Sequence, residues 1–200
     1  MSEVFTPTRY KLSVEDYHKL GEAGILNEDS RVELIAGELI EMAPIGGPHM
    51  AVVNRLNRLL VLAVGERGVV SVQNPVRLPP HSEPQPDFAI LKPRAADAAA
   101  AVPGPEDALL LIEVADATLA YDRGTKLVLY AKSGIAESWI VNLQSKCIEV
   151  YREPTAHGYT KRIGFQRGER VSPLALPTMS IAVAEVFAYL TGQSRAVELS

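Results

Sequence analysis

The sequence predicts an α/β (α+β) fold in which helices flank a mixed central β-sheet. Two observations carry this prediction: segments with helical apolar spacing lie between short apolar strands, and turn-forming residues mark hairpins near both ends of the chain. A chain of 200 residues corresponds to about one domain. We therefore expect a single domain over residues 1–200, with its core over about residues 10–190.

A short helix and a β-hairpin are predicted first. Ser13 suits the N-cap of a helix over residues 14–20, because its hydroxyl can accept a hydrogen bond from the first turn. Two runs of mixed apolar and acidic residues, 31–35 and 38–42, are separated by an alanine-glycine pair. This spacing, with glycine in the turn, is typical of a tight hairpin.

The middle of the chain alternates between helix and strand. Pro48 precedes a segment whose apolar positions recur at helical spacing, which predicts a long helix. An extended segment over residues 69–78 and a short apolar strand over 87–91 follow. Residues 108–114 form an apolar run with an acid near its end, as expected for a central strand buried on both faces.

The last third continues the alternation. The pattern predicts a helix over residues 122–132, strands over 138–143 and 146–151, and an edge strand over 159–165. Helical apolar spacing over residues 181–190 predicts a C-terminal helix.

Composition excludes several classes of function. The net charge of −4 argues against broad, sequence-blind coating of nucleic acid. A single cysteine excludes an internal disulfide and a thiolate zinc cluster. The apolar runs are shorter than the roughly 20 residues that cross a bilayer, and the N-terminal segment does not resemble a secretory signal. We therefore expect a cytoplasmic protein that does not enter a membrane.

Two acids mark the candidate site. Asp87 and Glu113 each lie where a short apolar strand meets polar chain. If the two strands are neighbours, both carboxylates can converge on one hard cation, because Mg²⁺ prefers oxygen ligands and takes one or two from protein carboxylates. Such a cation supports phosphodiester hydrolysis. The residues alone also allow a turn acid after proline and a paired acid at a strand end.

The pattern around these acids resembles a known family. Over about residues 10–190 the chain is similar to the Uma-type restriction endonucleases of the PD-(D/E)xK nuclease superfamily. The resemblance is carried by Pro86-Asp87, by Ile112-Glu113-Val114, and by the run Asp122, Arg123, Gly124, Lys126, Tyr130, Gly134, Ile135, Glu137, Trp139, Ile140 and Val141; the hairpin residues Glu33, Leu34, Ile35, Gly37 and Glu38, and His49, add to it.

The resemblance implies a restriction-endonuclease-like core with a Mg²⁺ or Mn²⁺ nuclease site that acts on DNA. Asp87 matches the acid of the PD element, and Glu113 matches the acid of the (D/E)xK element. The chain departs from the motif two positions later, where Ala115 stands in place of the lysine. Lys126, on the following helix, is the candidate replacement, because its ammonium group could stabilise charge near the scissile phosphate.

Asp122, Lys126 and Tyr130 are spaced four residues apart and share one face of an ideal helix. They either complete the site or form an exposed ion pair, with Asp122 as an N-cap.

For three further residues the sequence allows two alternative roles each. Glu38 is a third metal ligand or a solvated hairpin acid. His49 binds a ligand or phosphate, or else it caps or packs against the helix. Gln73 touches the site or serves hydrogen bonding at a strand edge.

Two hypotheses of function follow. The first is a divalent-metal-dependent DNA endonuclease with Asp87, Glu113 and Lys126 as its catalytic residues. It is expected to be a homodimer, because cutting both strands of a duplex needs two sites. The second is a catalytically inactive nuclease-like fold that serves as a nucleic-acid or protein interaction module, as Ala115 and the net negative charge suggest.

Overall fold

The computed structural model describes residues 8–93 and 101–191. Contacts within the chain define two compact units: Met1–Met42 with Arg77–Pro84, and Ala43–Val76 with Gln85–Ser200. The single domain expected over residues 1–200 stays a prediction.

The first unit begins with helix α1 (Val14–Glu22). The Ser13 hydroxyl accepts a hydrogen bond from the backbone N–H of Asp16 at 3.1 Å, and the Asp16 carboxylate accepts one from the backbone N–H of Ser13 at 3.0 Å. These reciprocal bonds form a capping box and satisfy two N–H groups that the helix leaves free. The predicted helix and its cap are confirmed.

A hairpin follows the short 3-10 turn η1 (Glu28–Ser30). Strand β1 (Val32–Ile35) pairs antiparallel with β2 (Glu38–Glu41). The two turn residues between them have φ angles of 50° and 85°, the left-handed values that a two-residue turn of this kind requires. The second of them is Gly37, where an added Cβ would lie 2.6 Å from the Cβ of Lys11. The predicted hairpin is confirmed.

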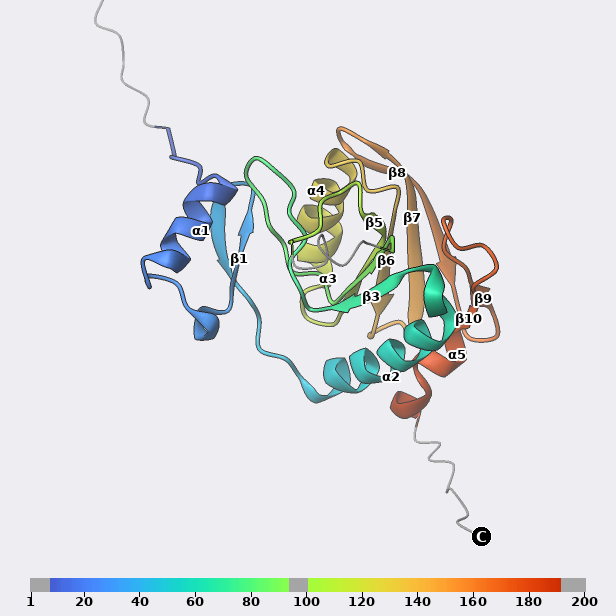
Figure 1. The fold of residues 1–200 in the computed structure, drawn as a ribbon. Coiled ribbons are helices and arrows are strands. Elements are labelled where there is room, and N and C mark those ends of the chain that lie inside the picture. Colours follow the sequence, from blue (N-terminus) through green and yellow to red (C-terminus); the bar gives the residue numbers. More distant parts are fainter. Residues whose placement is uncertain (1–7, 94–100, 192–200) are drawn as a thin grey trace, which may run out of the picture. The chain divides into compact units, whose positions relative to one another are not determined.

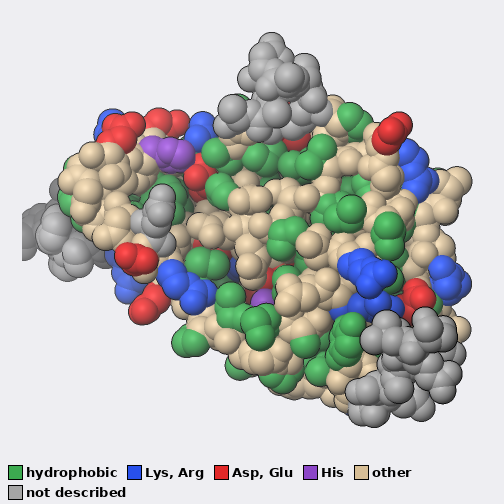
Figure 2. Space-filling view, turned by 60° about the horizontal axis from the view of Figure 1, so that its bottom comes forward, with side chains coloured by type: hydrophobic (Ala, Val, Ile, Leu, Met, Phe, Trp, Pro, Cys, Tyr) green, Lys and Arg blue, Asp and Glu red, His purple; other side chains and the backbone are tan. Residues whose placement is uncertain are grey.

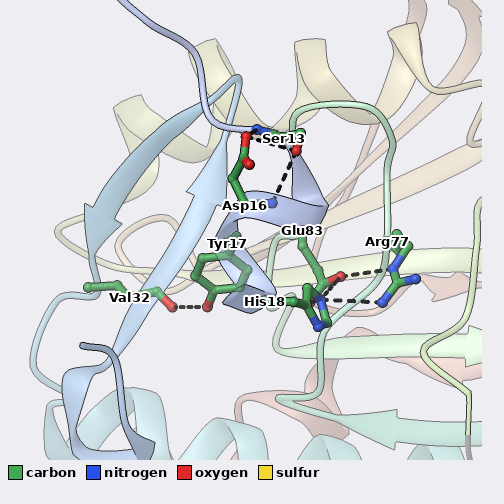
Figure 3. A network of polar contacts seen from close by, with 7 residues as sticks. All are labelled: Ser13, Asp16, Tyr17, His18, Val32, Arg77 and Glu83. Carbon is green, nitrogen blue, oxygen red and sulfur yellow. Dashed lines mark hydrogen bonds and ion pairs between the residues drawn. The ribbon is translucent and has the colours of Figure 1, made fainter. Parts of the chain in front are cut away.

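A polar network ties the second segment of this unit to helix α1 (Figure 3). Glu83, only 4% exposed, lies 3.0 Å from Nε2 of His18 and accepts a hydrogen bond from Nε of Arg77 at 3.1 Å. The Tyr17 hydroxyl donates to the backbone oxygen of Val32 at 3.0 Å. Because the buried Glu83 carboxylate has partners on both sides, its burial is compensated.

The second unit is built on a six-stranded mixed sheet with strand order β3-β4-β5-β6-β7-β8. The central pair β5 and β6 is parallel, and every other neighbouring pair in this sheet is antiparallel. The strand predicted over residues 159–165 forms one edge of the sheet. The strands are β3 (Val69–Val72), β4 (Phe88–Leu91), β5 (Ala108–Ala115), β6 (Glu137–Asn142), β7 (Cys147–Thr155) and β8 (Gly158–Phe165).

Helices lie on both faces of this sheet (Figure 1). On one face, α2 packs over strand residues that include Phe88, Ile112 and Trp139, all of them fully buried. The helical segment between β5 and β6 covers the other face. The predicted mixed sheet flanked by helices is confirmed. The helices are α2 (Gly47–Val64), the short η2 (Gly65–Arg67), α3 (Leu119–Tyr121), the π-helical η3 (Asp122–Lys126) and α4 (Leu127–Lys132).

The prediction of one continuous C-terminal helix over residues 181–190 is wrong. Its first two residues pair with a preceding strand, Ile181 opposite Val171, and the backbone N–H of Val183 donates to the oxygen of Glu169. Backbone pairing with a distant segment therefore outweighs the local helical pattern. The elements are β9 (Arg170–Val171), β10 (Ile181–Ala182), α5 (Val183–Val186) and a 3-10 turn, η4 (Ala188–Thr191).

On the face drawn in Figure 2, hydrophobic side chains are interspersed with polar ones, and Lys and Arg lie in several small groups. In residues 8–93 and 101–191, none of the helices is both long enough and apolar enough to cross a membrane.

Candidate nuclease site

Strand pairing brings Asp87 and Glu113 together. Strands β4 and β5 pair with Phe88 opposite Ile112, so Asp87, the residue directly before β4, lies beside Glu113 of β5. The backbone N–H of Val114 donates to Oδ2 of Asp87 at 2.8 Å, which fixes this arrangement. The two strands are therefore neighbours, as this expectation required, and the convergence of both carboxylates on one cation stays a prediction.

Asp87 is held by two further side chains. Nε2 of Gln73 donates to Oδ1 at 3.2 Å, and Nε2 of His49 lies 3.1 Å from Oδ2. This bond to Asp87 raises the pKa of His49 above its ordinary value. The Asp87 side chain is 13% exposed, so solvent and ligands can still reach it. Both side chains therefore contact a candidate site residue, so His49 is more than a helix cap and Gln73 is more than a strand-edge residue.

Glu113 is buried among polar partners. Its Oε1 accepts a hydrogen bond from the Tyr130 hydroxyl and lies 3.4 Å from Nζ of Lys126. Burial raises the pKa of Glu113 to about 8, although the Lys126 charge acts in the opposite direction. Glu113 and Lys126 are therefore a close pair of ionisable groups in which the acid readily holds a proton.

Lys126 reaches Glu113 from an unusual helical turn. Residues 122–126 form a π-helix rather than the ideal α-helix of the prediction, and π-helical turns are frequent at functional sites. Asp122 is 4% exposed, Lys126 is 7% exposed and Tyr130 is fully buried. The alternative of an exposed ion pair is therefore wrong. Asp122 is not the N-cap either, because the helical segment begins at Leu119 and the Thr118 hydroxyl donates to the Asp122 carboxylate at 2.7 Å.

The donor set at Asp87 and Glu113 fits a hard divalent cation. Two carboxylates on neighbouring strands match the one or two that Mg²⁺ takes from proteins while keeping several waters. A cation would also compensate the charge of the buried Glu113. Over residues 8–93 and 101–191, no group of three or more His, Cys, Asp and Glu side chains is arranged to bind a metal. Water and substrate would therefore supply the other ligands.

Glu38 lies in the first unit, at the start of strand β2. Its carboxylate accepts a hydrogen bond from Nη1 of Arg9 at 3.3 Å, and both side chains are more than half exposed. Asp87 and Glu113 belong to the second unit. The role of Glu38 as a third metal ligand stays a prediction.

Sequence reasoning missed a second polar cluster on the same face of the sheet, centred on Glu149. This acid is 2% exposed, although it stands between Ile148 and Val150 in strand β7. The sequence did contain a signal for this cluster: Glu149 is an acid flanked by apolar residues, and several arginines lie in the same part of the chain. A buried acid in a strand indicates specific charged partners.

The sequence and the fold were compared with known proteins. A family model, Uma2, described as "Putative restriction endonuclease", matches residues 14–184. No curated protein matches significantly. Among solved structures, the crystal structure of a putative nuclease belonging to DUF820 from Anabaena variabilis ATCC 29413 has a TM-score of 0.70 at 17% identity. It covers 90% of this chain and 99% of its own, so it supports the fold.

The family match extends from helix α1 to helix α5 and includes Asp87, Glu113 and Lys126. The resemblance found in the sequence is thus confirmed, and it supports nuclease activity in general. The chain belongs to the Uma2 family, whose members are described as putative restriction endonucleases.

Proposed function

We propose that this protein is a Mg²⁺- or Mn²⁺-dependent endonuclease that hydrolyses phosphodiester bonds in DNA. One observation carries the proposal: the ammonium group of Lys126 lies 3.4 Å from Glu113, and Asp87 directly precedes the strand that pairs with the strand of Glu113. A (D/E)xK site requires two acids and a cation at one place, and this chain has Ala115 where the motif lysine would stand. Lys126 supplies the cation from the π-helical turn.

Each residue has a defined task in this proposal. Asp87 and Glu113 would hold the divalent cation, which would polarise a phosphoryl oxygen and lower the pKa of a bound water. Gln73 and His49 orient Asp87 through their hydrogen bonds. Lys126 offsets the negative charge of Glu113 and can stabilise the charge that develops on the scissile phosphate.

Plasmid nicking tests the proposal. Supercoiled DNA is incubated with purified protein and Mg²⁺ or Mn²⁺, and the products are separated on a gel. We expect nicked or linear product from the wild type, and none from Asp87→Asn or Glu113→Gln. Equal activity in the wild type and in both variants would assign the nicking to a contaminant and overturn the proposal.

A catalytically inactive nuclease-like module is the second candidate, favoured by Ala115 at the position of the motif lysine. It predicts DNA binding that falls with salt, because phosphate contacts release counterions, and that is indifferent to metal and to Asp87→Asn. In the enzyme, Lys126→Ala removes turnover and leaves metal binding largely intact. In the inactive module, that variant has no turnover to lose.

The proposal also includes a homodimer and a cytoplasmic location. Cutting both strands of a duplex requires two sites, so a dimer would bring two copies of the site to one duplex. Sedimentation equilibrium of the purified chain measures this directly: the mass of two chains is expected, and a single-chain mass at assay concentrations would contradict the dimer.

A further inference from the structure

The polar cluster around Glu149 contains more positive charge than the acid requires. Arg123 binds both carboxylate oxygens, through Nε at 3.1 Å to Oε2 and through Nη2 to Oε1. Nη2 of Arg162 lies 3.1 Å from Oε2. Asn142 and Tyr151 donate to the same carboxylate at 3.1 Å and 2.6 Å. Among the residues that the structure describes, two guanidinium groups thus face one carboxylate, which leaves one positive charge in excess.

The two arginines, which we call the arginine cluster, both bind Glu149 and remain accessible. Burial of Glu149 would raise its pKa, but the hydrogen bonds from Arg123, Tyr151 and Asn142 lower that pKa to about 2, so the carboxylate stays charged. The guanidinium of Arg162 also lies 5.8 Å from the ring centroid of Tyr151. The Arg123 and Arg162 side chains are 37% and 56% exposed. A guanidinium fixed in this way loses little freedom when it binds an anion.

Strand register relates the arginine cluster to the candidate nuclease site. Glu113 pairs with Ile140, and Ile140 pairs with Glu149, so the two acids point to the same face two strands apart. Neighbouring strands are about 4.8 Å apart, which puts the two backbone positions about 10 Å from each other. Arg123 also shares the π-helical turn η3 with Lys126. One short segment therefore carries a cation to each acid.

This spacing matches a nucleic-acid backbone. One strand of DNA carries a phosphate about every 3.4 Å along the helix axis. Because the strand winds around that axis, neighbouring phosphates are farther apart through space than along it, so a group about 10 Å away can reach a phosphate one or two nucleotides along the strand. Arginine binds phosphate through a planar fork of N–H donors. We propose that the arginine cluster binds a backbone phosphate of the DNA one or two nucleotides from the phosphate held at Asp87 and Glu113. This inference rests on the proposed function.

Salt-dependent binding of a labelled DNA duplex tests the proposal, measured by fluorescence anisotropy with a chelator and in the Asp87→Asn background so that no cleavage occurs. Loss of one phosphate contact lowers the slope of log K against log[NaCl] by about 0.9. We expect that change, with weaker binding at low salt, for Arg162→Gln. Arg162→Lys keeps the charge and should keep most of the slope.

Lys161→Gln is the matched control. Lys161 precedes Arg162 in strand β8, so its side chain points to the opposite face, where it lies 3.6 Å from Glu153. Both variants remove one positive charge from the same strand. Equal slopes of log K against log[NaCl] in Arg162→Gln and Lys161→Gln would mean that only the loss of net charge weakens DNA binding, and would overturn the proposal.

A footprint on the unmutated chain removes any dependence on the folding of a variant. Phenylglyoxal modifies exposed arginines, and bound duplex should protect Arg162. Modification that is the same with and without duplex would overturn the proposal. The two proposals fail separately: failure of the proposed function appears as no nicking by the wild type, whereas failure of this inference appears as unaltered salt dependence in Arg162→Gln.

Discussion

Replacing Glu113 with glutamine removes a buried ionisable group while keeping the size and shape of the side chain. In the folded protein, burial raises the pKa of Glu113 to about 8 from an ordinary value of 4.5. The folded state therefore binds the proton more tightly than the unfolded state. Stability from this group is fully present below about pH 4.5 and is lost as the pH rises to about 8.

The magnitude follows from the size of the pKa change. Each pKa unit corresponds to about 1.4 kcal/mol. The folded protein therefore loses about 3 kcal/mol of stability by pH 7, where the unfolded chain has released the proton and the folded one still holds it, and about 5 kcal/mol above pH 8. Glutamine does not ionise and avoids this loss. We expect the variant to gain stability over the wild type as the pH rises from 5 to 8, with no further gain above pH 8.

Urea denaturation at a series of pH values, with a chelator to remove divalent ions, measures this difference directly. Glu185→Gln is the control, because Glu185 is an exposed acid in the same unit. A stability difference between Glu113→Gln and the wild type that stays constant from pH 5 to pH 8 would refute the reasoning, because it would mean that Glu113 is not a buried acid with a raised pKa.

Three further predictions concern the site and the fold. Lys126→Ala should abolish plasmid nicking with little change in Mn²⁺ affinity, whereas Lys132→Ala, an exposed change on the same helical segment, should nick normally; activity in Lys126→Ala would remove that lysine from the mechanism. His49→Ala should weaken Mn²⁺ binding about 10- to 100-fold in calorimetry, because His49 orients Asp87; an unchanged affinity would contradict this positioning role. Gly37→Ala should lower the free energy of unfolding by about 1 to 3 kcal/mol, because φ is 85° and the new Cβ would meet Lys11; Gly164→Ala, with open space around it, should cost less in the same denaturation assay.

Local features of the chain were predictable because neighbouring residues decide them. The capping box at Ser13 depends on residues three positions apart, and the hairpin turn depends on the conformational freedom of Gly37. The apolar run that became β5 is long enough to indicate a buried central strand whatever its partners are. Each of these patterns works within a few residues, so a single sequence contains the information.

Features that depend on distant parts of the chain were not predictable in the same way. Residues 181–190 have helical spacing, yet the segment begins as a strand because residues 170–171 offer it a pairing partner. The π-helical form of residues 122–126 also has no simple local signal.

For the candidate site as well, the sequence indicated the main residues but not the contacts that support them. The residue types at Asp87, Glu113 and Lys126 indicated a cation-binding centre, and the family resemblance linked them. The supporting contacts come from segments far apart in the sequence: His49 lies in the first turn of helix α2, and Gln73 has a φ angle of 52° just after strand β3. Their bonds to Asp87 become visible only when the chain is folded.

The central claim is that Asp87 and Glu113 share one divalent cation. Isothermal titration of Mn²⁺ into the metal-free protein tests it most directly. The account predicts one site in the wild type, loss of that site in Asp87→Asn and in Glu113→Gln, and its retention in Lys132→Ala. Binding of Mn²⁺ with the same affinity in the wild type and in both acid variants would contradict the account.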